Sequence, residues 1–371
     1  MTGSDPDSSV GTPVLKRDAI LDHLRTLIVA GEVKPGRRMP ARSKIKNQFK
    51  TGRRSVDQAF EQLEQDGFVH SEPSHGTYVS EHPPHLCHYA VVLAGEERDS
   101  AFPAALDREA AAMRKELSGR ILTYANVVPD STDYHRLLGD MKAHRVAGLI
   151  FQQNPENLGL AGTPVLTMPG IPRVALEKVP GIAAVLVDPQ AFADKAMLWL
   201  ARRGRRRLAC LVHCSGWSND MLSFWEDAAQ KNSLLLPCGR CHFLVAQTAR
   251  SLVQLLMSLP EAERPHAMIV QDDNLIEQAS LGLFDSGVRV GEEIDVVGHC
   301  NFSRVIPSHV PMKRLGWDDR ELLRACMAQI DRMRAGEQMP PPIVVEPLFD
   351  HEMEERKRQE TGKGGRSEKE Y

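Results

Sequence analysis

The segment 34–54, KPGRRMPARSKIKNQFKTGRR, carries the side chains best suited to bind a polyanion. It holds nine Lys or Arg residues and no Asp or Glu, in a chain whose formal net charge is -3. Residues 15–81 contain twelve basic and nine acidic residues, so the acidic excess lies in the rest of the chain. A basic segment between apolar residues at helical spacing is typical of a folded surface that binds nucleic acid. The sequence therefore predicts a module that binds double-stranded DNA, joined to an acidic body.

A second group of side chains with possible chemistry is Cys238-Gly-Arg-Cys241-His242, which matches the attachment pattern of c-type haem. That linkage belongs to exported proteins. The first residues, MTGSDPDSSVGTP, have neither a basic nor an apolar region of the kind found in signal peptides. We therefore expect a loop with reduced thiols and no cofactor, with a transient disulfide between the two cysteines as the alternative.

A third group is the cluster of nitrogen and sulfur donors in EHPPHLCH, residues 81–88. Four such donors can bind zinc, but the cluster lacks the paired spacing of a zinc finger and contains the stiff dipeptide Pro83-Pro84. We expect an interdomain linker and no metal site. The donors are His82, His85, Cys87 and His88.

Catalytic motifs give no support for an enzyme. Ser215 lies in HCSGW, which lacks the first glycine of a nucleophile elbow, and neither a P-loop nor a GxGxxG motif is present. The chain contains seven cysteines, an odd number, and no apolar run approaches the roughly 20 residues that cross a bilayer. We expect a cytoplasmic protein with reduced thiols, no membrane partner and no enzymatic activity.

The elements that must position the basic segment follow from the spacing of apolar residues. Such residues recur at helical spacing in 20–28 and again in 56–63, and Pro40 can begin a short helix between them. Residues 68–80, FVHSEPSHGTYVS, are typical of a strand, a turn and a second strand. Three helices and a two-stranded wing form a winged helix-turn-helix, whose recognition helix places its first residues at base edges in the major groove. The DNA-binding candidates are Arg42, Lys44, Thr51, Arg53, Arg54, Ser55, His75 and Gly76.

This segment resembles the DNA-binding domain of the GntR family of bacterial transcription regulators. The shared features are the Pro35-Gly36 turn, Pro40, the frame Ala59…Leu63…Gly67, the start Arg53-x-Ser55-Val56 and the wing Gly76-Thr77-x-Val79. The resemblance implies DNA contacts at Arg53, Ser55 and the wing. The chain departs from the family at Ser43, Gly52 and Asp57, so we expect an operator that differs from typical family sites.

From residue 89 onward, apolar strands alternate with amphipathic helices over about 260 residues. Repeated strand-helix units predict parallel sheets covered by helices on both faces, and their number fits two doubly wound α/β subdomains with a cleft between them. Strands are expected at 89–94, 121–127, 146–152, 164–168, 183–187, 208–213, 267–271, 295–298 and 343–347. Helices are expected at 103–117, 133–144, 191–203, 222–231, 275–286 and 318–336.

The body resembles the effector-sensing domain of LacI/GalR-type regulators, which is similar to periplasmic sugar-binding proteins. The segment 287–298, GVRVGEEIDVVG, is the most specific feature. A GntR-type head on such a body is the arrangement of arabinose-responsive repressors. Ligands of these folds bind at the carboxyl ends of the strands, where Asp272 and Asp273 could equally well cap a helix. The effector-binding candidates are Phe102, Gln152, Trp217, Asp272, Asp273 and Asn301.

Two hypotheses for the body remain open. LacI-type sensors have an aromatic residue and two aspartates where this chain has His299, Cys300 and Asn301, and an Arg-x-x-Gly-Phe motif is absent at 221–225. The first hypothesis is a DNA-binding regulator, a repressor by family analogy, that senses a small molecule such as a sugar and acts as a homodimer. The alternative is a regulator whose body only dimerises or binds proteins. The expected divisions are a disordered leader 1–14, the winged helix-turn-helix 15–81, a linker 82–88, the sensor 89–350 and a disordered tail 351–371.

Overall fold

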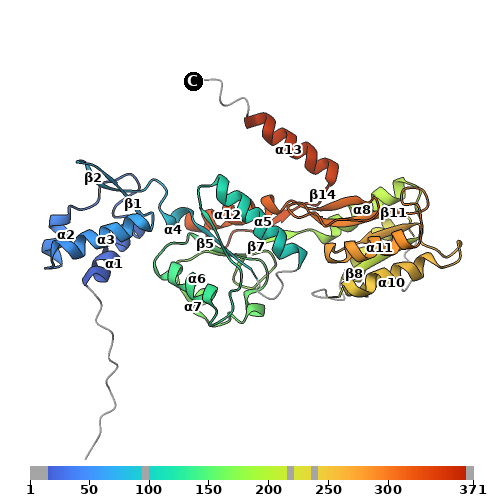
Figure 1. The fold of residues 1–371 in the computed structure, drawn as a ribbon, viewed down its shortest axis with the longest axis horizontal. Helices are drawn as coiled ribbons and strands as arrows, with labels where there is room; N and C mark the ends of the chain where they lie inside the picture. The colour runs from blue at the N-terminus through green and yellow to red at the C-terminus, as the bar shows by residue number, and fades with distance from the viewer. Residues whose placement is uncertain (1–15, 94–99, 215–220, 235–240, 365–371) are drawn as a thin grey trace, which may run out of the picture.

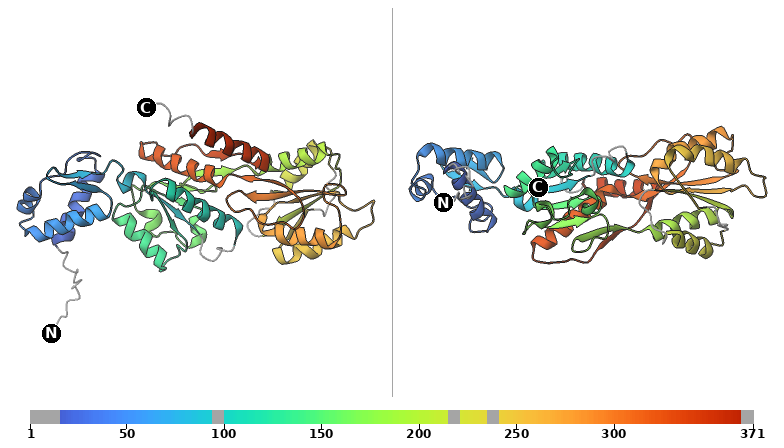
Figure 2. Two further views of the ribbon diagram at one scale, coloured as in Figure 1. Left: turned by 45° about the horizontal axis from the view of Figure 1, so that its top comes forward. Right: turned by 90° about the horizontal axis from the view of Figure 1, so that it is seen from below.

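The computed structural model describes residues 16–93, 100–214, 221–234 and 241–364. The molecule is elongated, with a small N-terminal domain, here called the head, at one end and two α/β lobes beyond it (Figures 1 and 2). The lobe next to the head is called the N-lobe and the distal one the C-lobe. Within these described ranges, no helix has the length and apolarity to span a bilayer. The expected leader, 1–14, lies outside the described residues.

The head is a winged helix-turn-helix, as the apolar spacing predicted. Ile20, Leu24, Phe60 and Leu63 are completely or almost completely buried and form its core with the apolar residues of the wing. The two wing strands pair antiparallel, with Val69 opposite Val79. Its elements are α1 (Lys16–Val29), α2 (Arg42–Gln48), α3 (Arg53–Gln65), β1 (Val69–Glu72) and β2 (Gly76–Val79).

The linker between head and N-lobe is a short helix, α4 (Pro84–Cys87), followed directly by the first strand of the N-lobe. Pro84, His85 and Cys87 are buried, and Figure 1 shows α4 between the two domains. Proline at the first helical position suits this turn because its missing N–H would have no partner there. The segment is therefore packed between the head and the N-lobe.

The N-lobe is a six-stranded, parallel sheet in the order β13-β7-β6-β5-β3-β4. The side chains of β3 and β5 are buried throughout, as expected for strands covered on both faces. The strands are β3 (Tyr89–Val92), β4 (Ile121–Tyr124), β5 (Gly148–Phe151), β6 (Arg173–Ala175), β7 (Ala183–Val187) and β13 (Ile343–Val345). The helices are α5 (Ala101–Glu116), α6 (Thr132–Lys142), η1 (Pro155–Leu158), α7 (Pro164–Thr167) and α12 (Asp319–Arg334).

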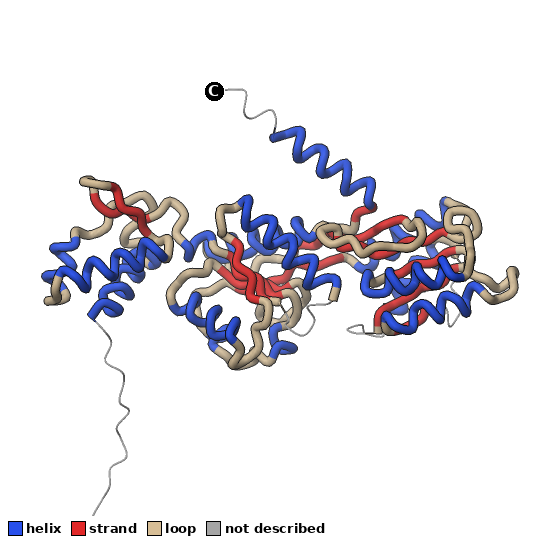
Figure 3. Tube along the Cα trace, in the orientation of Figure 1, coloured by secondary structure: helices blue, strands red, loops and turns tan. Residues whose placement is uncertain are grey.

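The C-lobe is a second six-stranded sheet in the order β14-β12-β11-β10-β8-β9, parallel except for its edge strand β14. The chain crosses between the lobes after β7, after β12 and after β13, and the two sheets lie in separate lobes (Figure 3). Residues at the carboxyl ends of strands from both sheets, among them Val187 and Trp317, line one cleft. The strands are β8 (Leu208–His213), β9 (Cys241–Leu244), β10 (Ala267–Val270), β11 (Asp295–Asn301), β12 (Lys313–Trp317) and β14 (Leu348–Phe349). The helices are α8 (Pro189–Arg202), α9 (Met221–Lys231), α10 (Ala246–Met257), η2 (Asp273–Leu275) and α11 (Ile276–Asp285).

Two local expectations differ from the structure. Residues 164–168 were predicted as a strand, but Pro164–Thr167 form one helical turn, because Pro164 occupies the first helical position after an extended Thr163. The strand of this unit is β6, at Arg173–Ala175.

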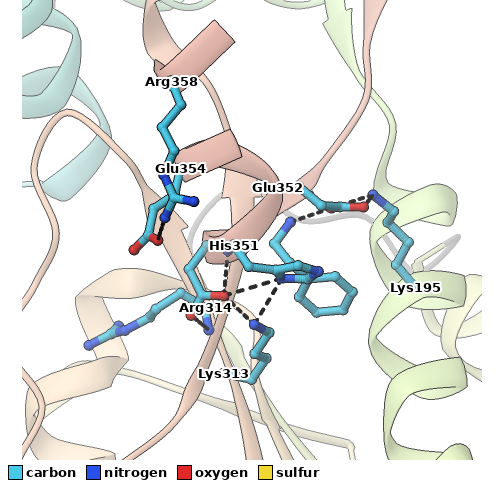
Figure 4. Close-up of polar contacts among 9 residues, drawn as sticks. Lys195, Lys313, Arg314, His351, Glu352, Glu354 and Arg358 are labelled. Carbon is cyan, nitrogen blue, oxygen red and sulfur yellow. Dashed lines mark hydrogen bonds and ion pairs between the residues drawn. The ribbon is translucent and has the colours of Figure 1, made fainter. Parts of the chain in front are cut away.

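The second difference is at the C-terminus, where residues 350–364 form helix α13 (Asp350–Gly364) instead of a disordered tail. Composition suggested disorder because the segment has few apolar residues, but ion pairs fasten the first turns of the helix (Figure 4). Lys195 Nζ lies 2.9 Å from the Glu352 carboxylate, Lys313 pairs with Asp350, and Met353 is buried. Residues 365–371 lie outside the described part of the chain.

Candidate functional site

The first candidate site is the amino end of α3, at the end of the head that points away from the N-lobe (Figure 1). Arg53 and Arg54 are exposed in the first turn and Ser55 is half-buried beside them. Gly52, at the N-cap, provides no side-chain hydrogen bond to the helix, and the first turn contains no acidic residue. Unsatisfied N–H groups and the positive end of the helix dipole therefore meet solvent where an anion such as a DNA phosphate would be stabilised.

Asp57 modifies this basic surface from the next turn of α3. Its carboxylate lies 3.3 Å from Arg53 Nε and 3.2 Å from Arg42 Nε. The Arg53 side chain is 89% exposed, so its pair with Asp57 is weak and easily exchanged for another anion. Arg42 is held more firmly, because it also donates to Thr77 Oγ1 at 3.2 Å and stacks 4.5 Å above the Phe60 ring. Arg42 thus braces the wing against α3, whereas Arg53 is held only by its exposed pair with Asp57.

The wing forms the other edge of the same surface. His75 is exposed at its tip, and its ring nitrogen Nδ1 lies 2.9 Å from the Pro73 carbonyl oxygen. Gly76 has a φ of +123°, and a Cβ atom there would stand 2.6 Å from Arg38 Nε. Glycine is therefore required both by the backbone conformation and by the passage of the Arg38 side chain. Lys44 is exposed on α2, and Thr51 is half-buried in the turn before α3.

The second candidate site is the cleft between the lobes, a cavity of about 920 Å³. Its described lining contains side-chain amides, two carboxylates, two histidines and a tryptophan, and no lysine or arginine. It is lined by Ser100, Phe102, Gln153, Asn157, Leu176, Val187, Pro189, His213, Val245, Ala246, Gln247, Gln271, Asp272, Asp273, Asn274, His299, Asn301, Trp317 and Leu322.

Asp273 is the most elaborately paired residue of the cleft. Its Oδ2 accepts a hydrogen bond from Asn301 Nδ2 at 2.7 Å, and its Oδ1 lies 3.6 Å from His299 Nδ1. Burial opposes ionisation of both groups, yet the pKa of His299 is raised by the facing carboxylate and the pKa of Asp273 is lowered by His299 and Asn301. Each group thus favours the charged form of the other, and the two side chains form a buried polar floor.

Asp272 has a different role, because its Oδ1 accepts from the backbone N–H of Asn274 and from Asn274 Nδ2, both at 2.8 Å. It is the N-cap of η2. Asn274 in turn accepts a hydrogen bond from the Ala101 N–H of the N-lobe at 2.9 Å. Asp272 thus orients a contact between the two lobes as well as lining the cleft.

Three buried polar atoms of the cleft lining have no hydrogen-bond partner among the described residues, and one of them is His299 Nδ1, 3.6 Å from Asp273. Gln271 Oε1 is an unused acceptor on a side chain that is 6% exposed, and Trp317 Nε1 is an unused donor on one that is 8% exposed. An unpaired buried polar group costs about 1–3 kcal/mol. A ligand that supplied both a donor and an acceptor would recover this free energy.

The structure places four of the six effector candidates, Phe102, Asp272, Asp273 and Asn301, in the cleft lining. Gln152 is buried beside it, and the next residue, Gln153, faces the cleft instead. Trp217 lies outside the described residues. His299 and Trp317 were missed as candidates. The strand-end rule could have indicated His299, which directly follows the expected strand 295–298, but the strand that ends at Trp317 was not itself expected.

The His and Cys residues singled out in 82–88 and 238–242 lie within ordinary packing and strand contacts where the structure describes them. His85 is buried and stacks on Phe68, with ring centroids 5.8 Å apart, and Cys87 Sγ donates to the His82 carbonyl oxygen at 3.3 Å. Cys241 lies beside Cys210 on the neighbouring strand, while Cys238 is outside the described residues. The described residues contain no group of three or more His, Cys, Asp or Glu arranged to hold a metal ion.

Comparison with protein families assigns both parts of the chain. Residues 16–79 match the bacterial regulatory proteins of the gntR family, and residues 199–348 match the periplasmic binding protein-like domain. The chain is 23% identical over 301 residues to the arabinose metabolism transcriptional repressor of Geobacillus stearothermophilus, covering 77% of this chain and 82% of that protein.

Solved structures share the fold of the body. A regulatory protein of the LacI family from Chloroflexus aggregans matches with a TM-score of 0.54 and 19% identity, covering 71% of this chain and 96% of that one. The transcriptional regulator CelR in complex with cellobiose matches with a TM-score of 0.54 and 15% identity, covering 84% of this chain and 98% of that one. These likenesses establish the periplasmic-binding-protein-like architecture.

Proposed function

We propose how this chain, a transcription regulator with a GntR-type DNA-binding domain and a LacI-type sensor domain, recognises DNA and effector. A homodimer binds a two-fold DNA operator through two heads. An uncharged, polyhydroxylated small molecule in the cleft changes the affinity for that operator. The observation that carries the proposal is the exposed amino end of α3, with Arg53 and Arg54 beside uncapped backbone N–H groups.

On the DNA side, Arg53 contacts a base edge, with guanine as the favoured partner because its O6 and N7 accept a bidentate guanidinium. Arg54 and Lys44 neutralise phosphates, and Ser55 and Thr51 donate to the backbone. His75 and Gly76 place the wing against the adjacent phosphates. Arg42 contributes charge, but its bonds to Asp57 and Thr77 make it mainly a support for the surface.

On the effector side, the charge of the cleft favours a neutral ligand. The described lining has two carboxylates and no lysine or arginine, so a phosphate or carboxylate ligand would be repelled. The unpaired acceptor Gln271 Oε1 and the unpaired donor Trp317 Nε1 would be satisfied by a ligand that has both donors and acceptors. Phe102 and Trp317 supply apolar faces. A neutral sugar has this chemistry. Phe102, Asp273 and Asn301 are the proposed contacts.

Effector binding is proposed to act through cleft closure. The two lobes are joined by three crossovers, and a ligand that contacts both lobes stabilises the closed arrangement. Closure moves the N-lobes of a dimer, and with them the heads, so effector and operator alter each other's affinity by the same factor. Repression of transcription in the absence of effector is the simplest outcome of such coupling.

The test is selection of bound sequences from random DNA by the full chain, with and without neutral sugars. The proposal expects a two-fold symmetric motif and a sugar that changes its enrichment. Calorimetry with that sugar should show weaker binding for Gln271→Leu and Trp317→Phe than for Glu292→Gln, a surface control on the C-lobe. Enrichment of a motif with no response to any sugar would favour a body that serves only as a dimerisation or protein-binding platform.

A further inference from the structure

The head and the N-lobe meet at a junction formed by packed side chains and an ion pair. The C-terminal end of α3 meets the N-lobe through Asp66, which follows the helix as its C-cap. Phe68, two residues later, stacks on His85 of the linker helix with ring planes 12° apart. Gly67, between them, approaches Pro84 so closely that an added Cβ would be in van der Waals contact with it. The recognition helix is therefore fastened at the end opposite its DNA-contacting residues.

Asp66 is the centre of this contact. One carboxylate oxygen pairs with Arg25 of α1, and the other lies 3.0 Å from Arg145 Nη1 of the N-lobe. Gln62 Nε2 donates to the same carboxylate at 3.1 Å. Arg145 is itself oriented by Asp140, whose Oδ1 lies 2.7 Å from its Nε. One carboxylate thus joins two head elements to the sensor body.

The position of Asp66 argues for a purpose beyond stabilising the helix. The C-terminal end of a helix carries partial negative charge, so a carboxylate there is unfavourable by itself. The Asp66 side chain is also only 7% exposed and the Arg25 side chain 10%, so both charges have lost most of their hydration. Removing one partner of a buried ion pair is costly, because the other charge is left buried without compensation. The pair should therefore hold the head in one orientation.

We infer that Asp66 is a positioning residue for operator recognition, which fixes the angle of α3 relative to the N-lobe through Arg145. The inference rests on the proposed function, since it explains how movement of the sensor reaches the DNA. A helix of 13 residues spans roughly 20 Å. A rotation of the N-lobe would therefore reach Asp66 through Arg145 and move Arg53 at the opposite end of α3.

Arg145→Gln is the variant that separates positioning from folding, and Asp66→Asn tests the other partner of the same pair. Arg145→Gln leaves the Asp66–Arg25 pair inside the head intact, so the head retains its own ion pair. Arg145→Lys keeps the charge and serves as the conservative rescue. Arg289→Gln removes an exposed arginine ion pair on the C-lobe and is the matched control.

The first measurement is small-angle X-ray scattering of each full-length protein without DNA. Wild type, Arg145→Lys and Arg289→Gln are expected to share one profile, while Asp66→Asn and Arg145→Gln give a broader distance distribution, because their heads swing. Identical profiles for all five proteins would overturn the inference. This measurement does not depend on DNA binding, so it decides the inference even if the chain binds no operator and the proposed function fails.

The second measurement is affinity for operators whose half-sites are separated by zero, one or two extra base pairs. Wild type should lose at least about fivefold in affinity with the altered spacings, the lower end of typical coupling between sites. Asp66→Asn and Arg145→Gln should lose less than twofold, while their affinity for a single half-site matches wild type. Retained spacing discrimination in both variants would contradict a positioning role.

Discussion

Asp57 shares its carboxylate between Arg53 and Arg42, beside the proposed DNA contacts. The chain departs from the GntR pattern at this position, and the structure gives the departure a consequence. An acidic residue beside the proposed base contact lowers the affinity for any phosphate, whatever the base sequence. Specific contacts must then supply more of the binding free energy, which favours discrimination over nonspecific binding.

Asp57→Asn should therefore tighten binding to unrelated duplex DNA. Freeing Arg53 for one more phosphate contact steepens the plot of log affinity against log salt by up to about 0.9. Fluorescence anisotropy on a random duplex at several salt concentrations measures this slope. Glu292→Gln, which removes an exposed partner of Arg289 in the C-lobe, is the control and should leave the slope unchanged. Equal slopes for Asp57→Asn and wild type would mean that Asp57 does not restrain Arg53.

The buried His299–Asp273 pair should make stability of the ligand-free chain depend on pH. The pKa of His299 is raised above 6.5, so its contribution is complete below that value and is lost as pH rises through the folded pKa. His299→Gln should lower the melting temperature most near pH 5.5 and least near pH 9. The exposed pair His351–Asp350 has the same 3.6 Å separation, so His351→Gln is a matched control with little expected effect. A pH-independent deficit in His299→Gln would indicate a packing role only.

At the scale of elements, most helices and strands with strong periodicity were predicted, although α10 was missed, and contacts between elements were not predictable. Ile20, Leu24, Phe60 and Leu63 define the head helices because each helix repeats its own pattern within a few residues. Asp66 and Arg145 are 79 residues apart, so no local pattern connects them. Of the cleft, strand ends indicated Phe102, Asp273 and Asn301, but which of Gln152 and Gln153 faces inward depends on the local course of the chain after β5.

The linker helix α4 should respond to acid through His85. Burial, assisted by Arg334 and His144, lowers the pKa of His85 to about 4, whereas the unfolded chain takes up this proton near 6.5. Stability is therefore lost as pH falls from 6.5 towards 4. His85→Phe keeps a ring against Phe68 and removes the titration, so its melting temperature should decline less between pH 7.5 and 5.

Circular dichroism melts at these two pH values measure the effect, with His135→Phe as an exposed control. An equal acid-induced decline in wild type and His85→Phe would show that protonation of this ring is not what weakens the junction.

Helix α13 should depend on salt, because charged contacts hold its first turns. Lys195, Lys313 and Arg356 pair with Glu352, Asp350 and Glu321 at a partly exposed surface. Salt screens such pairs, with a Debye length of about 3 Å at 1 M. Hydrogen exchange of residues 353–359 should accelerate between 0.05 and 1 M salt, while the amides of α12, packed in the core, keep their protection. Salt-independent exchange in α13 would assign its order to Met353 packing instead.

At the scale of the whole molecule, the C-lobe, the N-lobe and the head lie in series. In the proposed mechanism the cleft between the lobes receives the effector, the N-lobe carries its movement to the junction, and α3 delivers that movement to DNA. Two connections in this series are observable in the structure: the Asn274–Ala101 hydrogen bond between the lobes, and the Asp66–Arg145 pair between N-lobe and head. The structure thus shows one polar contact at each of the two boundaries between these parts.

The central claim is that the amino end of α3 binds DNA, and salt titration of the full chain on its selected operator tests it most directly. Wild type should show a linear fall of log affinity with log salt. One lost base contact of about 1–3 kcal/mol corresponds to a loss of affinity of about 5- to 150-fold, so Arg53→Ala combined with Arg54→Ala should weaken binding by this much or more. The double substitution should also flatten the plot of log affinity against log salt. Arg289→Gln should behave as wild type. An operator affinity and salt slope unchanged by the double substitution would contradict the account.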